Sequence, residues 1–378
     1  MTVVEIAFWV SAGLIVYTHA GYPLLLTVLA RLRPAPRYRT GDHPAVSLIV
    51  AAHDEQEVIE EKVRNALGLD YPPERLEVIV ASDGSTDGTA QLARAAAQGE
   101  PRVRVIELER GGKVKAQDAA VDAASGDVLA FSDANAFWKA DALQALVRPF
   151  ADSDVGYVCG CLVYLAPGGS NQEGVYWRYE NGVRALESRL ASVTAGNGAI
   201  YAVRREAYLR LDPRTSHDLS FPFNLVKRGW RAVYEPAARA VERPVATLEN
   251  EFRRKRRMMS HAWPAVLGGG LLDPRGYGPA YALEVYSHRG LRYATPFLHV
   301  IAFGTNLALL GRGGVYVAAF AIQVGVLAGA LLARFTGDRL RLLALCRYYV
   351  LMTASLAAGL WDNLRRGTPA TWEREGVR

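Results

Sequence analysis

The stretch Val78-Ile-Val-Ala-Ser-Asp-Gly-Ser-Thr-Asp87 is an apolar run that stops at an acidic turn containing a glycine. A second stretch, Val128-Leu-Ala-Phe-Ser-Asp-Ala-Asn135, ends in the same way. Buried strands of an open α/β sheet have this pattern, and polar groups at their carboxyl ends face a ligand in the crevice beyond the strands. If both strands belong to one sheet, Asp83 and Asp133 converge on one bound molecule.

Strand-like and helix-like segments alternate around these two stretches. Strands are expected at 46–52, 76–82, 103–108 and 128–132, with helices at 55–67, 86–97 and 113–124. Further strands are expected at 157–165, 199–203 and 232–234, with helices at 173–189 and 219–228. This alternation predicts βαβ units and a mostly parallel, doubly wound sheet with right-handed crossovers.

Half of the 378 residues are hydrophobic, and long apolar runs gather at the two ends of the chain. One run precedes the α/β segment and three follow it, each close to the length that crosses a bilayer as a helix: 6–29, 293–310, 315–335 and 342–361. A cleaved signal peptide is the alternative for the first run, but no basic region precedes it. The sequence therefore predicts a multi-pass membrane protein with a water-exposed middle.

The basic residues indicate a membrane rather than a nucleic acid as partner. The net charge is +6 and the pI is near 9.2, yet the arginines lie beside the apolar runs and form no base-reading motif. This is the positive-inside pattern, so we expect membrane lipids as partners and the central domain at the cytoplasmic face of the inner or plasma membrane. The three cysteines form no disulfide framework or metal-ligand set and indicate a reducing compartment.

Two segments beside the later apolar runs are rich in basic residues. Residues 246–292 combine apolar residues with the basic block Phe252-Arg-Arg-Lys-Arg-Arg-Met-Met-Ser-His-Ala-Trp263, which suits either an interfacial helix or a solvated helix face. If all four apolar runs cross the bilayer, the tail from Asp362 lies outside although it carries Arg365 and Arg366. An interfacial or re-entrant placement of one run removes this conflict.

The expected organisation has five parts. They are an N-terminal transmembrane helix at 1–32, a cytoplasmic α/β domain at 43–245, a basic amphipathic segment at 246–292, transmembrane helices at 293–361 and a basic tail at 362–378.

Polar residues at strand ends and helix starts are candidates for chemistry. Asp83 suits a hydrogen bond to a nucleobase or ribose, and a helix cap by Ser85 or Asp87 is the plain alternative. Asp133 and Asn135 offer oxygen ligands for Mg²⁺ or Mn²⁺, which proteins often hold through one or two groups plus a diphosphate.

Two further segments suit phosphate and proton chemistry. Arg110-Gly-Gly-Lys113 precedes a helix, where backbone N–H groups and an ammonium attract phosphate, although the segment lacks the P-loop pattern. Asp218, at the start of a helix, suits a base that removes a proton from a hydroxyl, and a cap is again the plain alternative.

The order of these segments resembles the inverting, GT-A type family 2 glycosyltransferases, the group that includes cellulose, chitin and hyaluronan synthases. The matching text lies at 46–55, at 82–87 (Ser-Asp-Gly-Ser-Thr-Asp), at 110–113, at 125–135 (Ser-Gly-Asp-Val-Leu-Ala-Phe-Ser-Asp-Ala-Asn), at 194–202 and at 226–235. The resemblance therefore covers nearly the whole central domain.

The resemblance implies a GT-A Rossmann-like fold and a nucleotide-diphosphate sugar as donor, with a UDP-sugar favoured. By the family pattern, the donor contacts are Asp54, Glu55, Asp83, Lys113 and Asp133. A divalent Mg²⁺ or Mn²⁺ is expected on Asp133 and Asn135, and Asp218 is the expected catalytic base of an inverting hexosyltransferase. The residues expected on the acceptor side are Asn197, His217, Arg256, Arg257 and Trp263.

The chain also departs from the family pattern. Asn135 replaces the usual second aspartate, His217 replaces the first member of an acidic pair, and the Gln-x-x-Arg-Trp motif of processive synthases is absent. We therefore expect a single transfer to a lipid-linked or surface-polysaccharide acceptor. A processive polysaccharide synthase, a catalytically silent nucleotide-sugar-binding subunit and a nucleotidyltransferase are the alternatives.

Overall fold

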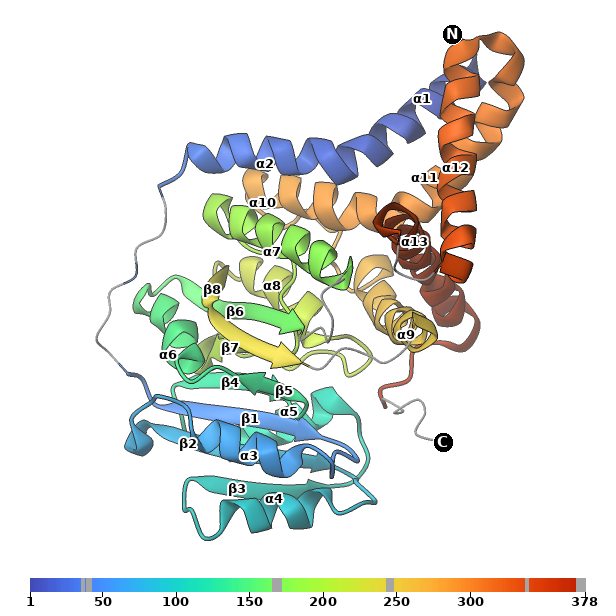
Figure 1. The fold of residues 1–378 in the computed structure, drawn as a ribbon. Coiled ribbons are helices and arrows are strands. Elements are labelled where there is room, and N and C mark those ends of the chain that lie inside the picture. The colour runs from blue at the N-terminus through green and yellow to red at the C-terminus, as the bar shows by residue number, and fades with distance from the viewer. Residues whose placement is uncertain (35–37, 39–42, 165–171, 243–247, 337–339, 372–378) are drawn as a thin grey trace.

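The computed structural model describes residues 1–34, 38, 43–164, 172–242, 248–336 and 340–371. Within these residues one mixed sheet has the strand order β3-β2-β1-β4-β7-β6-β8-β5 (Figure 1). The strands are β1 Val46–Ala52, β2 Leu76–Asp83, β3 Val103–Leu108, β4 Val128–Asp133, β5 Ala136–Trp138, β6 Val155–Tyr164, β7 Tyr201–Arg204 and β8 Arg231–Glu242. Parallel pairing joins β1 to β2 and β4, β2 to β3, and β6 to β8, which confirms the mixed, mostly parallel sheet.

The side chains of consecutive residues of β1 point to opposite faces of the sheet. Val50 packs with α3 (Ile59–Leu67) and α4 (Thr89–Ala97), whereas Ile49 packs with α5 (Lys113–Ala123) and α8 (His217–Val226). Because side chains alternate along a strand, a strand covered by helices on both faces is apolar almost throughout. This explains the continuous apolar runs in the sequence. It also explains why Asp83 and Asp133, at the ends of two such runs, emerge at one edge of the sheet.

The apolar ends of the chain form helices that rise from one side of the α/β domain (Figure 1). In the described part of the chain, four helical stretches are long and apolar enough to span a membrane: Val3–Arg31, Pro279–Arg312, Gly314–Thr336 and Arg341–Arg366. The first contains α1 (Val3–Val16) and α2 (Tyr22–Arg31), and the second contains α10 (Pro279–Glu284) and α11 (Leu291–Leu309). The third is α12 and the fourth is α13.

Only part of the first two stretches lies away from the domain. The α2 residues Tyr22 and Leu26 pack on Val183 of α7 (Gln172–Leu190), and the Tyr22 hydroxyl donates to Glu187 Oε1 at 2.8 Å. In contrast, Phe8 of α1 packs with Leu309 and Tyr316 at the distant ends of α11 and α12. The N-terminus and the link between α11 and α12 therefore lie on the same side, away from the domain (Figure 1).

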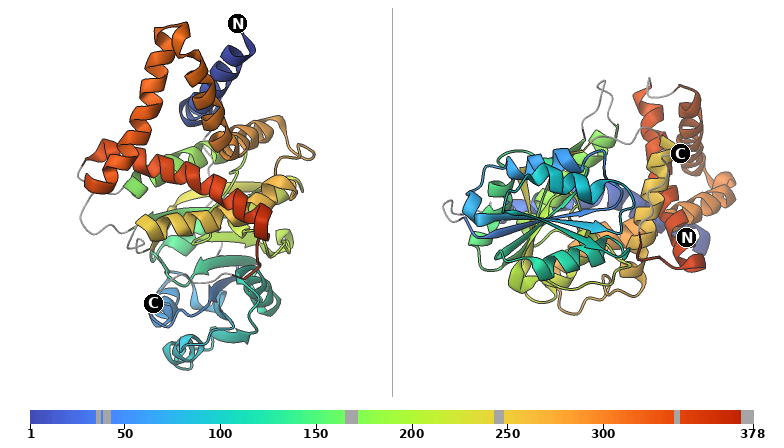
Figure 2. Two further views of the ribbon diagram at one scale, coloured as in Figure 1. Left: turned by 90° about the vertical axis from the view of Figure 1, so that its right-hand side faces the viewer. Right: turned by 90° about the horizontal axis from the view of Figure 1, so that it is seen from below.

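The position of α13 bears on the side of the membrane at which the basic tail lies, because four full spans would place that tail outside. Figure 2 shows α13 running across the lower end of α12 and along α9 (Leu248–Leu267). The two helices approach closely at Gly359, where an added Cβ would lie 2.6 Å from Met259 Cβ and 2.8 Å from the backbone nitrogen of Ser260. The helix extends to Arg366, past the expected boundary at 361, and the part of the tail after residue 371 lies outside the described residues.

Candidate active site

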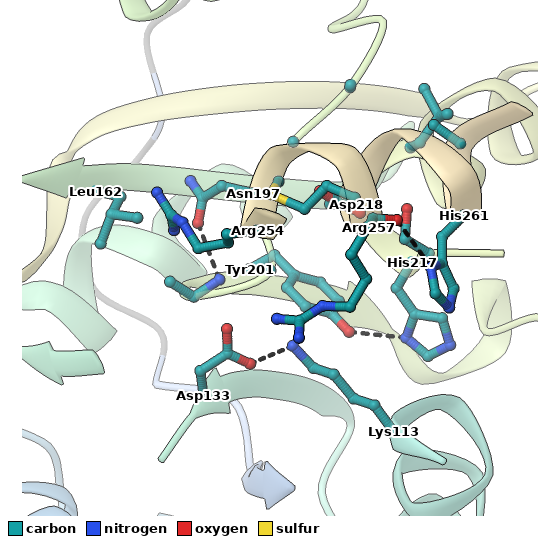
Figure 3. A pocket seen from close by; sticks show the side chains of 18 of the residues that line it. Lys113, Asp133, Leu162, Asn197, Tyr201, His217, Asp218, Arg254, Arg257 and His261 are labelled. Carbon is teal, nitrogen blue, oxygen red and sulfur yellow. Dashed lines mark hydrogen bonds and ion pairs between the residues drawn. The ribbon is translucent and has the colours of Figure 1, made fainter. Parts of the chain in front are cut away.

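A cavity of about 390 Å³ lies between the carboxyl ends of the parallel strands and the helices α9, α11 and α13. Side chains from both regions line it, as Figure 3 shows for its central part. At the sheet end the lining includes His53, Glu55, Asp83, Arg110, Lys113, Asp133, Asn135 and Glu242. At the helix end it includes Arg254, Arg257, His261, Arg289, Arg292, Tyr293 and Met352.

Asp83 is buried at the end of β2 and fixes the turn before α5. Its Oδ1 accepts from the backbone N–H groups of Gly111 at 2.7 Å and Gly112 at 3.0 Å, and its Oδ2 accepts from Arg110 at 3.0 Å. Gly112 has φ +94°, a left-handed conformation that favours glycine. Asp83 therefore holds the turn that presents Lys113, a role that the sequence did not indicate.

Lys113 and Asp133 form an ion pair across the cavity floor (Figure 3). Lys113 opens α5 and Asp133 closes β4, so the parallel sheet brings together two residues twenty positions apart. The amide nitrogen of Asn135 donates to Glu242 Oε1 at 2.8 Å. Glu242, at the end of β8, therefore lies beside Asn135 in the cavity lining. Sequence reasoning missed it, because nothing in the sequence pairs β5 with β8.

Lys62 lies behind the turn that carries Asp133 and Asn135 and is 1% exposed. Its ammonium donates to Ser132 Oγ at 2.7 Å and to the carbonyl oxygen of Ala136 at 2.5 Å. Burial lowers the pKa of Lys62 to about 7, an effect that the negative charge of Asp133 opposes. Sequence reasoning missed this residue, although a lysine on the buried face of an amphipathic helix is itself a signal.

His217 is a buried, neutral imidazole at the start of α8. Its Nδ1 lies 2.8 Å from the Tyr201 hydroxyl, and its ring meets Phe131 and Phe221 edge-on. Burial lowers the pKa of His217 to about 3, with a smaller contribution from the charge of Lys113. The imidazole therefore packs within an aromatic cluster directly before Asp218 in the chain, and His217 also lines the cavity.

Asp218 follows His217 and lines the cavity. Its backbone carbonyl accepts from the Gly196 N–H at 2.8 Å, which ties the start of α8 to the loop at 194–199. His261 of α9 comes from the other side; burial lowers its pKa, and the charge of Asp218 opposes that shift. Asn197, expected on the acceptor side, uses its polar atoms to hold the loop: Nδ2 donates to the Gly160 carbonyl at 2.5 Å, and Oδ1 accepts from the Ile200 N–H at 3.0 Å.

The helical period of α9 decides which of its basic residues reach the cavity. Arg254 and Arg257 point inward, and Arg257 extends toward the ion pair of Lys113 and Asp133 (Figure 3). Arg256 lies on another face and forms an ion pair with Asp362 of α13, with Nε 2.5 Å from Oδ2. Trp263 is buried in the core, where Nε1 donates to the Leu356 carbonyl at 2.9 Å.

Three predicted site residues therefore lie outside the cavity lining. Arg256 and Trp263 contact α13, because positions 256, 260 and 263 share a helix face and the lining residues of α9 (254, 255, 257–259, 261 and 262) lie on the others. Asp54, with φ +52°, turns its carboxylate to the Thr86 N–H at 2.8 Å and stabilises the turn beside the cavity. Glu55, its neighbour, does line the cavity.

Comparison with known proteins supports the assignment of the domain. Residues 47–231 match the family model described as glycosyl transferase family 2. The beta-monoglucosyldiacylglycerol synthase of Synechocystis sp. is 32% identical over 165 residues, 41% of this chain and 34% of that protein. The poly-beta-1,6-N-acetyl-D-glucosamine synthase of Staphylococcus aureus is 24% identical over 220 residues, 55% of this chain and 52% of that protein.

These curated relatives are longer than the matched region, and this chain spans between a third and about half of their length. A solved structure is similar over nearly the whole chain. The mannosyltransferase from Pyrobaculum calidifontis in complex with GDP-Man and Mn²⁺ has a TM-score of 0.71 and 25% identity, and the match covers 95% of this chain and 99% of that one.

Proposed function

This chain belongs to glycosyl transferase family 2 through residues 47–231, and we propose that it transfers a sugar from a nucleotide-diphosphate sugar to a lipid-linked or surface-polysaccharide acceptor at the cytoplasmic face of the membrane. One observation carries the proposal. A single cavity joins the polar strand ends, Asp218 and the helices that continue into the candidate membrane spans. Such a cavity can hold a polar donor at one end and an amphiphile at the other.

The donor occupies the sheet end of the cavity in this proposal. We assign the nucleoside to Glu55 and Asp83, which line this end of the cavity. Lys113 opens α5, where an ammonium and a helix N-terminus together favour phosphate. The resemblance in sequence favours a UDP-sugar, whereas the similar mannosyltransferase was solved with GDP-Man, so the donor screen includes both nucleotides.

A divalent cation suits the residues at the end of β4. Asp133 would supply a carboxylate. Asn135, whose amide nitrogen donates to Glu242, would supply its oxygen as a second hard ligand. A bound Mg²⁺ or Mn²⁺ would neutralise charge on the donor diphosphate. Asp133 would then release Lys113, and the ammonium of Lys113 would be available to the same diphosphate.

Asp218 is the proposed general base. It would accept the proton of the acceptor hydroxyl as the hydroxyl oxygen bonds to the anomeric carbon of the sugar. The bond from that carbon to the diphosphate oxygen breaks on the opposite face, so one displacement inverts the configuration. Arg257, which extends toward Lys113 (Figure 3), and Arg254, which also lines the cavity, would stabilise the charge that the leaving diphosphate gains.

The membrane arrangement supports a cytoplasmic active site. The N-terminus and the link between α11 and α12 lie away from the domain (Figure 1). Arg31 ends α2, and the Arg33 carbonyl accepts from Arg189 of α7, so these two arginines lie at the domain side. If α1, α11 and α12 span the bilayer while α13 lies at the interface across α12, Arg365 and Arg366 fall on the domain side. This arrangement follows the positive-inside rule and removes the conflict that four full spans produce.

A donor screen with the purified full-length chain tests the proposal. Release of nucleoside diphosphate from UDP- and GDP-sugars is measured with Mg²⁺ and Mn²⁺, and Asp218→Asn is compared with Asp70→Asn, which changes an exposed carboxylate. We expect turnover in the parent and in Asp70→Asn, and a loss of at least a hundredfold in Asp218→Asn. Unchanged turnover in Asp218→Asn would contradict the base assignment, and no turnover with any donor would favour the silent subunit.

The products separate the remaining alternatives. A single added sugar supports one transfer, whereas a ladder of long chains would identify a processive synthase. Release of pyrophosphate in place of a nucleoside diphosphate would identify a nucleotidyltransferase.

A further inference from the structure

The helix end of the cavity contains a buried guanidinium with an unused donor. Arg289 lies in the π-helical turn Val285–Gly290 between α10 and α11, and it is 7% exposed. Its Nε donates to Thr194 Oγ1 at 2.9 Å, but its buried Nη2 has no hydrogen-bond partner within the described residues. Because an unsatisfied buried donor destabilises the fold, this nitrogen suits an acceptor that a ligand brings.

The charges around Arg289 favour an anionic ligand. The cations that line this end of the cavity are Arg184, Arg254, Lys255, Arg257, Arg289 and Arg292, whereas its lining carboxylates are Glu180 and Asp218. Glu180 is already in an ion pair with Arg292. Glu187, behind this surface, accepts from the Tyr22 hydroxyl and lies 2.7 Å from His288 Nδ1. In the cavity lining, as far as the structure describes it, cations therefore outnumber carboxylates at this end.

The same end of the cavity is apolar beside its cations. Met258 and Met259 of α9 and Met352 of α13 line it, which are three of the four methionines in the chain. Tyr293 of α11 lies with them. Flexible thioether side chains adapt to ligands of irregular shape, and α11 and α13 are candidate membrane-associated helices. A hydrocarbon chain fits this wall better than a free sugar does.

We propose that this end of the cavity binds the phosphate group of a phosphorylated amphiphile and that Arg289 contacts that phosphate. The planar guanidinium offers paired N–H donors that match phosphate oxygens, and the methionine wall accepts the first part of the hydrocarbon chain. The inference rests on the proposed function, since a phosphate held here would place the acceptor beside Asp218. It also deepens that function, because it selects a phosphorylated lipid over a neutral one.

Lipid binding without any donor tests this subsite. The full-length chain in neutral detergent is titrated with dihexanoyl phosphatidic acid, with dihexanoylglycerol and with inorganic phosphate, and tryptophan fluorescence reports binding. We expect the phosphatidic acid to bind at least tenfold more tightly than the neutral lipid. We also expect Arg289→Met to weaken its binding at least tenfold. Arg312→Met, which removes an exposed arginine in the turn that follows α11, should leave binding unchanged.

Each other result overturns part of the inference. Equal binding of the two lipids, or full binding by a folded Arg289→Met, contradicts the phosphate contact. Inorganic phosphate that binds as tightly as the phosphatidic acid indicates a free-ion site and contradicts the amphiphile. If Arg289→Met does not fold, Arg289→Lys is measured in its place. It keeps the positive charge but lacks the paired N–H donors of the guanidinium, and we expect it to bind the phosphatidic acid several-fold more weakly than the parent.

The outcome is separable from that of the proposed function. Binding that depends on Arg289 in a chain without sugar turnover would support the subsite and contradict the transferase. Turnover with an unphosphorylated acceptor that is insensitive to Arg289→Met would support the transferase and contradict the subsite.

Discussion

The Lys62 ammonium and the Ser132 hydroxyl lie 2.7 Å apart in the core, directly behind the turn that carries Asp133 and Asn135. The same ammonium reaches the carbonyl of Ala136, so one buried cation joins both ends of the turn. We therefore regard Lys62 as a positioning residue: it holds the turn that carries the proposed metal ligands and is not a ligand itself.

Lys62→Met removes both hydrogen bonds and leaves their acceptors buried. We expect a loss of about 1–3 kcal/mol of folding free energy and a rise of about tenfold in the Mn²⁺ concentration that half-activates the enzyme. Thermal unfolding and metal titration of activity measure the two effects. Lys115→Met serves as the control, because Lys115 lies on the exposed side of α5. An unchanged metal requirement in Lys62→Met would show that the turn keeps its geometry unaided.

His217 makes stability depend on pH. Its folded pKa is about 3, below the ordinary 6.5, so the unfolded chain binds more protons between these values. Stability is therefore complete above pH 6.5 and declines as the pH falls, by about 2 kcal/mol at pH 5 from this group. His217→Gln, which cannot titrate, is expected to show a smaller drop in melting temperature from pH 7 to pH 5. An identical drop in both chains would mean that other groups cause it.

Neighbouring arginines on α9 are expected to behave differently. Arg257→Met removes a cation that points to the proposed diphosphate site, and turnover should fall at least tenfold. Arg256→Met breaks the pair with Asp362, which is partly exposed, and should cost about 0–1 kcal/mol of stability with turnover within twofold. Kinetics and thermal unfolding of both variants check this. Equal kinetic losses would argue against the separation of the two faces.

The contact between α9 and α13 depends on Gly359. Gly359→Ala places a Cβ within 2.8 Å of backbone on α9, and we expect a loss of about 1–3 kcal/mol despite the better helix propensity of alanine. Gly325→Ala on α12 meets nothing within 4 Å and provides the control. Thermal unfolding in detergent compares them, and a Gly359→Ala chain as stable as Gly325→Ala would contradict close packing at this site.

The proposed topology places the end of α13 on the domain side. In a chain whose native cysteines are replaced by alanine, Arg366→Cys should resist an impermeant maleimide added outside intact cells, whereas Arg312→Cys should react. Labelling after permeabilisation confirms that Arg366→Cys is reactive. Reaction of Arg366→Cys in intact cells would restore the model of four full spans.

The sequence by itself determined the sheet and one end of the site. Strands covered on both faces are apolar almost throughout, so β1, β2 and β4 were predicted within one residue of their observed ends. The polar residue that stops each strand lies at the cavity, because parallel strands end at a common edge. Local sequence patterns therefore predicted the position of a side chain wherever strand periodicity and strand direction alone determine it.

Contacts between distant segments decided the rest. The sequence does not tell which face of α9 meets the cavity, so Arg256 and Arg257 were equivalent until α13 packed beside one of them. Lys62 and Arg289 acquire their importance only through burial against segments seventy or more positions away. Hydropathy predicted the approximate length of α13 but not its orientation relative to the other helices. Packing against α9 and α12 sets that orientation.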